Sequence, residues 1–333
     1  MKKLIYFISL MIILLFVTGC GSGPESASFS SPYVGGDNGL IAEFQDNNPP
    51  DEIYDNNLKP FKLVLKLKND GEFKVSKNSI LIQAVGFSPN DFGIKNPSAL
   101  KVNSLDIDLE PKAKSQDGTV RPGGETLVPL PKNGNLAYEG NVAGTGELKL
   151  PFGVDICYLY KTKSTSLLCV TPNLLRPSDD DVCEVNAEKQ VYSSGSPIKV
   201  SKLIESATTD KIRFEFEITF NGRGRLIKPN GENFNSQNCD ATEYDFDKID
   251  MVWVEVDPKG EWGHSTVKCS SLSNNNIGYV KLFESNGVKK AIVNCEIPIT
   301  NKGNYVKPLD IDIYYQYKER LNKEITIKHI ETG

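Results

Sequence analysis

Apolar and polar residues alternate with a period of two along several segments of this chain. The clearest case is Lys211–Phe220, where Ile, Phe and Ile residues alternate with Arg, Glu and Thr; residues 61–68 and 309–318 show the same pattern. In a β-strand, successive side chains point to opposite faces, so this spacing predicts strands with one buried and one wet face. Turn sequences such as Asn286-Gly287 separate the strands, and no strand–helix–strand rhythm appears. The pattern predicts an all-β fold of antiparallel sandwiches.

The sequence also carries two pairs of similar segments at similar spacing. Asp155–Lys161 aligns with Asp312–Lys318 at an offset of 157 residues, and both contain Asp-Ile followed by Tyr-x-Tyr-Lys or a close variant. Residues 61–71 align in phase with residues 212–222 at an offset of 151, with glycine closing each segment. Together they indicate a duplicated unit. The alternative is two unrelated strands that share only their alternation.

Three motifs in the sequence allow a comparison with a known family. An alternating strand that ends in Asn-x-Gly (residues 66–71), a later Pro-Gly-Gly-Glu-Thr (122–126) and a closing Tyr-x-Tyr strand resemble the Ig-like domains of prokaryotic surface proteins, in particular the cell-adhesion-related domain called CARDB. The second unit keeps the strand and the Tyr-x-Tyr end but lacks the Pro-Gly-Gly. The resemblance implies two tandem Ig-like β-sandwiches, which we place at 39–176 and 183–331, with a linker at 177–182.

The N-terminus has the layout of a secretory signal. Met1-Lys2-Lys3 precedes sixteen mostly apolar residues, Leu4 to Gly19, and the segment ends in Val17-Thr18-Gly19-Cys20. This ending resembles the lipobox of prokaryotic lipoproteins, which implies that residues 1–19 are a removed signal peptide and that Cys20 is lipidated. An uncleaved anchor or ordinary cleavage are the alternatives, although a membrane span usually needs ~20 apolar residues. Residues 20–38 are rich in Gly, Ser and Pro, and we interpret them as a flexible tether.

Charge limits the partners of the mature chain. Removal of the leader takes Lys2 and Lys3 from the 38 basic residues and leaves 36 against 43 acidic residues, a net charge of −7. An acidic protein of this kind is a poor partner for nucleic acid, because affinity there comes from neutralising phosphates. No second long apolar run follows the leader. We therefore expect contact with a membrane through the lipid anchor, an unidentified protein or glycan partner, and no nucleic acid.

Six cysteines follow Cys20, which is an even number in a chain with an export signal. Such counts indicate disulfides, here three among Cys157, Cys169, Cys183, Cys239, Cys269 and Cys295. A three-residue hairpin at 162–164 would place Cys157 opposite Cys169, with Leu159 opposite Leu167, so we predict that bridge. The other four cysteines allow three connectivities, and we expect Cys269–Cys295 and Cys183–Cys239.

The sequence gives only weak signals for a ligand or metal site. An acidic cluster at Asp240–Asp250 lacks the glycine and spacing of an EF-hand loop, so a solvated loop is the better interpretation. Trp262, next to a glycine in a loop, is a candidate ligand contact, and core packing is its alternative. Residues 221–225 (Asn-Gly-Arg-Gly-Arg) could bind an anion or form a plain turn with solvated arginines. We predict no metal and no cofactor.

Catalytic motifs are also missing. There is no Gly-x-Ser-x-Gly or His-Glu-x-x-His, and the only histidines are His264 and His329. We expect a noncatalytic, lipid-anchored cell-surface protein that presents Ig-like domains for adhesion, binding or envelope assembly. Two alternatives stay open: a solute- or glycan-binding lipoprotein of a transport system, and a secreted hydrolase whose paired carboxylates only the fold would reveal.

Overall fold

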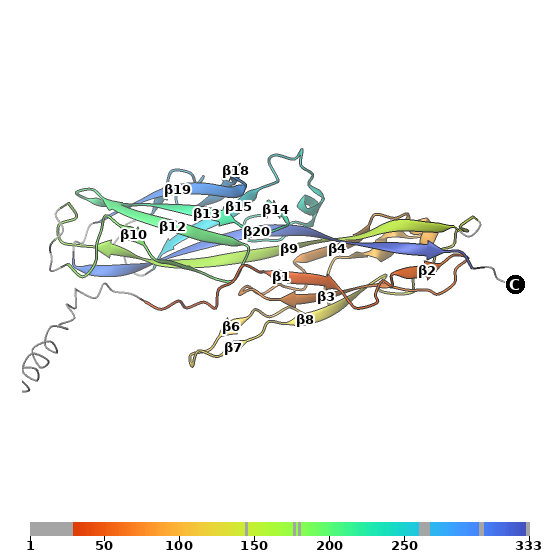
Figure 1. The fold of residues 1–333 in the computed structure, drawn as a ribbon. Coiled ribbons are helices and arrows are strands. Elements are labelled where there is room, and N and C mark those ends of the chain that lie inside the picture. The colour runs from red at the N-terminus through yellow and green to blue at the C-terminus, as the bar shows by residue number, and fades with distance from the viewer. Residues whose placement is uncertain are drawn as a thin grey trace, which may run out of the picture.

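Two strands of 24 residues run along the length of the molecule (Figure 1). In the computed structural model, β9 (Glu147–Val170) and β20 (Tyr305–Lys328) pair antiparallel from end to end, with Glu147 opposite Lys328 and Val170 opposite Tyr305. At ~3.3 Å per residue, each strand spans roughly 80 Å. The structure describes residues 29–143, 146–175, 178, 181–259, 267–299 and 303–330.

The two long strands form the centre of one sheet. Its strand order is β17-β15-β20-β9-β4-β5, with β11 also paired to β9 and with β14 and β2 also paired to β20. The flanking strands are β2 (Glu52–Tyr54), β4 (Ile80–Val85), β5 (Lys101–Val102), β11 (Val191–Ser193), β14 (Arg225–Ile227), β15 (Met251–Pro258) and β17 (Ile277–Lys281). Apart from β2, which runs parallel to β20, these pairings are antiparallel.

Two smaller sheets cover this central sheet, one in each half of the molecule. The first has the order β1-β3-β8, formed by β1 (Leu40–Phe44), β3 (Leu63–Asn69) and β8 (Glu125–Leu130). The second has the order β10-β12-β13-β19-β16, with β18 paired to β19. Its strands are β10 (Glu188–Lys189), β12 (Ile198–Ala207), β13 (Lys211–Phe220), β16 (Lys268–Cys269), β18 (Phe283–Ser285) and β19 (Val288–Pro298). We refer to the halves as the β3 half and the β13 half.

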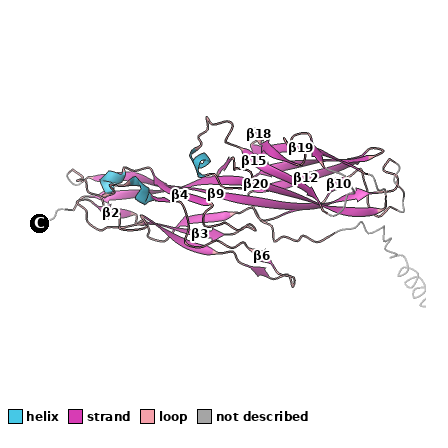
Figure 2. Cartoon of the chain, turned by 180° about the vertical axis from the view of Figure 1, so that it is seen from behind, coloured by secondary structure: helices cyan, strands magenta, loops and turns pink. Residues whose placement is uncertain are grey.

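The remaining elements are short. A hairpin of β6 (Ala113–Lys114) and β7 (Val120–Arg121) projects from the β3 half, and η1 (Pro89–Phe92) and η2 (Pro97–Leu100) are single 3₁₀ turns near the C-terminal end of the body (Figure 2). A third turn, η3 (Ser236–Asp240), lies near the middle. Within the described ranges, no helix is both long enough and apolar enough to cross a membrane.

The predicted alternation matches the observed burial. In β3, Leu63, Leu65 and Leu67 are fully buried while the residues between them are partly exposed. In β13, Phe214, Phe216 and Ile218 are buried in the same alternating way. The prediction of an all-β fold with antiparallel sheets is therefore confirmed.

The chain does not form two separately cored sandwiches in sequence order. β9 begins in the β3 half and ends in the β13 half, and β20 runs the opposite way, so each half contains strands from both predicted units. Buried residues of both halves, such as Leu65 and Phe216, belong to one continuous hydrophobic cluster. The β9–β20 ladder crosses from one half to the other without a break in its register.

The duplicated motif lies at the centre of this arrangement. Its two copies, in β9 and β20, pair with each other so that Tyr158 faces Tyr317 and Tyr160 faces Tyr315. Outward from this pair, the strand order of the central sheet is β9-β4-β5 on one side and β20-β15-β17 on the other. The halves are thus related by an approximate twofold axis between β9 and β20, as expected for a duplicated unit.

Candidate functional site

A groove opens where the two covering sheets meet over the paired strands β9 and β20. Its volume is about 1030 Å³, and it lies between the start of β1 and the turn from β13 to β14. We call it the junction groove. It is lined by residues 37–42, Asp155, Tyr158, Pro197, residues 221–225, Lys289 and residues 317–321.

Two tyrosines on the floor of the junction groove hold its two sides. The Tyr158 hydroxyl accepts a hydrogen bond from the Leu40 N–H at 3.2 Å and donates to the Leu40 carbonyl at 3.4 Å. These two bonds give the backbone N–H and C=O groups of Leu40 a partner on the edge of β1 that does not pair with β3. The Tyr317 hydroxyl accepts the Gly224 N–H at 2.7 Å and so fixes the turn between β13 and β14. Both tyrosines are buried.

Glu319 follows Tyr317 on the inward face of β20 and also lines the groove. Burial raises the pKa of its carboxyl group to about 7. Its Oε1 atom is buried and forms no hydrogen bond within the described structure. A buried carboxyl oxygen without a donor is costly, so Glu319 marks a place where a ligand that supplies a hydrogen bond would be stabilised.

Positive side chains surround the rest of the groove. Arg320 and Lys318 contact the Asp155 carboxylate, at 2.8 Å and 3.6 Å, and Lys289 contacts Asp250 at 2.7 Å. Arg223 and Arg225, by contrast, form no ion pair with any described residue, and Arg223 is exposed to solvent. Both guanidinium groups are available to bind an anion. Arg225 lies opposite Lys318 in the β14–β20 ladder, so its side chain is on the face of the sheet away from Glu319.

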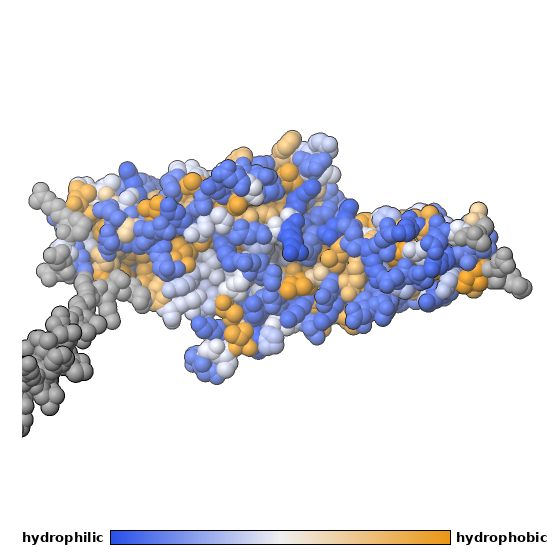
Figure 3. All heavy atoms as spheres, viewed as in Figure 1, coloured by the Kyte–Doolittle hydropathy of each residue, from blue (hydrophilic) through white to orange (hydrophobic). Residues whose placement is uncertain are grey.

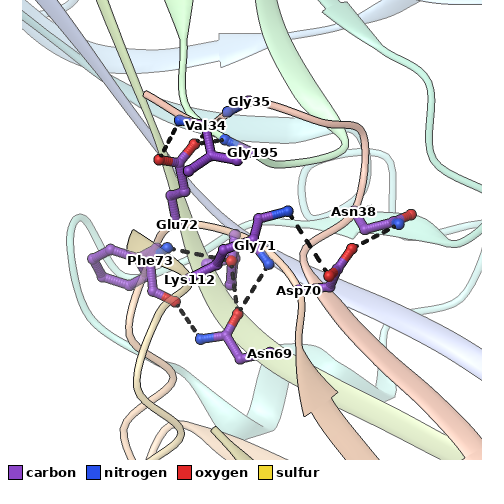
Figure 4. Close-up of polar contacts among 11 residues, drawn as sticks. Val34, Gly35, Asn38, Asn69, Asp70, Gly71, Glu72, Phe73, Lys112 and Gly195 are labelled. Carbon is purple, nitrogen blue, oxygen red and sulfur yellow. Dashed lines mark hydrogen bonds and ion pairs between the residues drawn. The ribbon is translucent and has the colours of Figure 1, made fainter. Parts of the chain in front are cut away.

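The two halves are joined near the groove by the turn after β3 (Figure 4). Asn69 is fully buried there; its side chain donates to the Phe73 and Leu109 carbonyls and accepts the Gly71 N–H and the Tyr160 hydroxyl. A side chain on Gly71 would collide with the Tyr160 hydroxyl and with backbone, which is why this close approach needs glycine.

Glu72, in the same turn, binds backbone from two other segments. Its carboxylate accepts the N–H groups of Val34 at 2.9 Å, Gly35 at 2.8 Å and Gly195 at 2.7 Å, as Figure 4 shows. Residues 33–38, which the sequence analysis assigns to the tether, are thus hydrogen-bonded to the folded body at Glu72. The reason is that a carboxylate accepts several backbone donors at once, and a composition rich in Gly and Ser does not reveal such a partner.

The structure forms three disulfides, and one of them has the predicted pairing. Cys269 and Cys295 lie opposite each other on β16 and β19 and are bonded. The other bridges join Cys157 to Cys239 and Cys169 to Cys183, so the predicted Cys157–Cys169 and Cys183–Cys239 pairs are wrong.

The error comes from the predicted hairpin at 162–164. These residues continue β9 instead of turning, because Thr162, Lys163 and Ser164 pair with residues 311–313 of β20. Twelve residues of extended strand place Cys157 and Cys169 roughly 40 Å apart, far beyond disulfide range. Three disulfides within an otherwise packed β-body indicate an extracytoplasmic protein.

The other predicted site residues are distributed unevenly. The 221–225 turn lines the junction groove, whereas the acidic 240–250 segment lies around η3 and forms no metal-binding group among the described residues. His329 contacts the buried Asp55 carboxylate at 2.7 Å, far along β20 from the groove. Cys20, Trp262 and His264 lie outside the described residues. The face shown in Figure 3 is mostly hydrophilic, with separate hydrophobic spots.

Glu319 is a groove residue that was not predicted from the sequence. A signal was present: Glu319 continues the inward phase of Leu309, Ile311, Ile313, Tyr315 and Tyr317. An acidic residue in the apolar phase of a strand indicates either the end of the core or a buried functional group.

Comparison with known proteins gives only distant matches. No protein-family model matches the chain, and no curated protein matches it. Among solved structures, the secreted serine protease VesC from Vibrio cholerae is 9% identical over 83% of this chain, with a TM-score of 0.17, and this chain spans half of its length. The CupB6 tip adhesin from Pseudomonas aeruginosa is 10% identical over 88% of this chain and 98% of its own, with a TM-score of 0.15. Neither likeness carries an argument about function.

Proposed function

We propose that this protein is a noncatalytic, lipid-anchored cell-surface protein of the Ig-like type, and that it binds its partner at the junction groove. The observation that carries the proposal is the groove itself, a polar hollow of about 1030 Å³ with two unpaired arginines and a carboxyl oxygen that lacks a donor. Concave sites with a few convergent polar groups are the usual places for ligand binding.

The shape of the body fits a presenting role. The β9–β20 ladder runs through both halves, so the groove is held on a stiff, elongated body (Figure 1). Three disulfides stabilise this body in the oxidising space that the leader implies. A lipidated Cys20 would attach the body to the membrane through the short segment that precedes Phe29.

A hydrolase is the competing function, and one observation favours it. The raised pKa of Glu319 suits a general acid. Glycoside hydrolysis, however, needs a second carboxylate on the same site. Asp155, the candidate on β9, lies opposite Arg320, so its side chain is on the face of the sheet away from Glu319. There its carboxylate contacts Arg320 and Lys318. We therefore favour binding over hydrolysis.

The anchor is tested by metabolic labelling with a palmitate analogue in a prokaryotic host, comparing wild type with Cys20→Ala. We expect label and detergent-phase partitioning in the wild type and neither in the variant. Equal labelling of both proteins would defeat the lipid anchor. Cys169→Ala with Cys183→Ala is the matched control, since it removes two cysteines that form a disulfide and leaves the lipobox intact.

A further inference from the structure

The outer edge of β20 contains an unpaired stretch beside the junction groove. β14 pairs with this edge at Gln316–Lys318, and β2 pairs with it at Thr326–Lys328. Between the two, neither ladder reaches residues 319–325. Interior gaps of this kind differ from an ordinary sheet edge, because strands are already aligned on both sides of the gap.

The backbone groups that face this gap can be assigned from the ladder. The Thr326 N–H donates outward to the Asp51 carbonyl at 2.9 Å, and alternate residues of a strand direct their N–H and C=O groups to the same side. Arg320, Asn322 and Glu324 therefore point theirs into the gap. No described residue forms a hydrogen bond with these backbone groups.

The other half of the molecule shows how such a gap is filled. At the duplication offset of 157 residues, Leu321–Lys323 corresponds to Ser164–Ser166 of β9. That equivalent edge is covered by β11, which pairs antiparallel with Ser164–Ser166. The same fold position is thus occupied by a strand in the β13 half and unpaired in the β3 half.

The inward polar side chains of β9 and β20 differ in the same way: those of β9 have a partner and Glu319 of β20 lacks one. Glu319 corresponds to Thr162, whose hydroxyl lies 2.5 Å from the Ser196 hydroxyl, in the segment that follows β11. The Ser193 hydroxyl similarly meets Ser164 at 2.8 Å. The segment over β9 therefore supplies hydroxyl groups to the inward polar residues of that strand, whereas Oε1 of Glu319 has no such donor.

We propose that an extended segment of a partner polypeptide pairs with the 319–325 edge of β20, as β11 pairs with β9. The segment presents a hydroxyl side chain to Glu319 and an acidic side chain to Arg223 and Arg225, the two groove arginines without ion pairs. Strand addition of this kind takes its affinity from main-chain hydrogen bonds and its specificity from alternate side chains. The inference rests on the proposed binding function and names its ligand class.

The test is a selection of random twelve-residue peptides displayed on phage against the full-length protein in detergent micelles. Asn322→Pro, which lacks the outward N–H, serves for counter-selection; proline is tolerated where the N–H faces a free edge. Asn322→Ala is the matched control, because it removes the same side chain and keeps the N–H. Enriched peptides are synthesised and their Kd values measured by fluorescence anisotropy.

We expect enriched peptides to contain Ser or Thr at alternate positions and at least one Asp or Glu. Binding should weaken about tenfold or more in Asn322→Pro, and in Arg223→Ala with Arg225→Ala, and by less than about twofold in Asn322→Ala. In the wild type, bound peptide should slow hydrogen exchange at the Arg320, Asn322 and Glu324 amides, a readout that needs no variant to fold.

Two results would overturn the proposal. One is peptide binding that is equal in wild type and Asn322→Pro with no protection of these amides, or no enrichment of any peptide for the wild type. The other is binding of a hexagalacturonate oligosaccharide that is lost with the two arginines and unaffected by Asn322→Pro, which would make the groove a site for acidic glycans. Either result leaves the labelling test of the anchor unchanged, so the two failures are distinguishable.

Discussion

Tyr158 and Tyr317 face each other across β9 and β20 with ring centroids 5.7 Å apart, and their hydroxyl groups bind opposite sides of the junction groove. Tyr158 holds the edge of β1 at Leu40, and Tyr317 holds the β13–β14 turn at Gly224. The pair therefore fixes the width of the groove from beneath. Tyr158 belongs to one copy of the duplicated motif and Tyr317 to the other, so each copy contributes one hydroxyl to this role.

Tyr158→Phe should lower the stability of the protein by about 1–2 kcal/mol, because it leaves the buried N–H and C=O groups of Leu40 without a partner while keeping the ring. Chemical denaturation followed by fluorescence would measure the change in the free energy of unfolding. Tyr244→Phe, at a side chain that is 78% exposed, is the control and should have no measurable effect. Equal effects of the two substitutions would contradict the assigned role of the Tyr158 hydroxyl.

Glu72→Gln should release residues 33–38 from the body. A neutral amide is a weaker acceptor than a carboxylate, and only one of its two end groups accepts, so the three N–H groups that Glu72 binds lose part of their partner. Hydrogen exchange measured by mass spectrometry should become at least tenfold faster at Val34, Gly35 and Gly195, with β13 unchanged. Glu110→Gln, on an exposed carboxylate, is the comparison. Unchanged exchange at Val34 and Gly35 would show that other contacts hold this segment.

Glu319 should make the protein less stable as pH rises. Its folded pKa is raised to about 7 from an ordinary value of 4.5, so its contribution is fully present below about pH 4.5 and is lost as pH rises to about 7. Glu319→Gln removes this dependence and should stabilise the protein at pH 8 by up to about 3 kcal/mol, with little change at pH 4.5.

Denaturation curves at several pH values between 4.5 and 8 would measure this effect. Burial also raises the pKa of Glu205 to about 7, so the wild type should show a slope of the same sign from two groups. The difference between wild type and Glu319→Gln isolates the contribution of Glu319. A variant with the same pH dependence as the wild type would refute it.

Disulfide mapping should find Cys157 linked to Cys239 in the native protein. Proteolysis under non-reducing conditions, followed by mass spectrometry, distinguishes this bridge from Cys157–Cys169. Its loop spans 82 residues against 14 for Cys169–Cys183, so in the chain-entropy model its removal costs about 4.5 kcal/mol against about 3 kcal/mol. The Cys157→Ala, Cys239→Ala double variant should therefore unfold at lower denaturant than the Cys169→Ala, Cys183→Ala variant. The reverse order would contradict the connectivity or the model.

Local pattern was sufficient to find individual strands. The alternation at 211–220 coincides with β13, and that at 61–68 overlaps β3, because a half-buried strand must alternate wherever it packs. The same information located the Cys269–Cys295 pair across the Asn286-Gly287 turn. It also identified the duplicated Tyr-x-Tyr motif, although not that its two copies would pair with each other.

The sequence by itself determined which segments are strands, that the strands have one apolar face, and that an even number of cysteines follows a segment that resembles an export leader. Only the tertiary structure decided that β9 continues through Thr162–Ser164 rather than turning, which cysteines meet, and that Glu319 lies in a groove beside an unpaired edge. The physical reason is that alternation records which face of a strand is buried, whereas pairing depends on which distant segment satisfies its backbone hydrogen bonds.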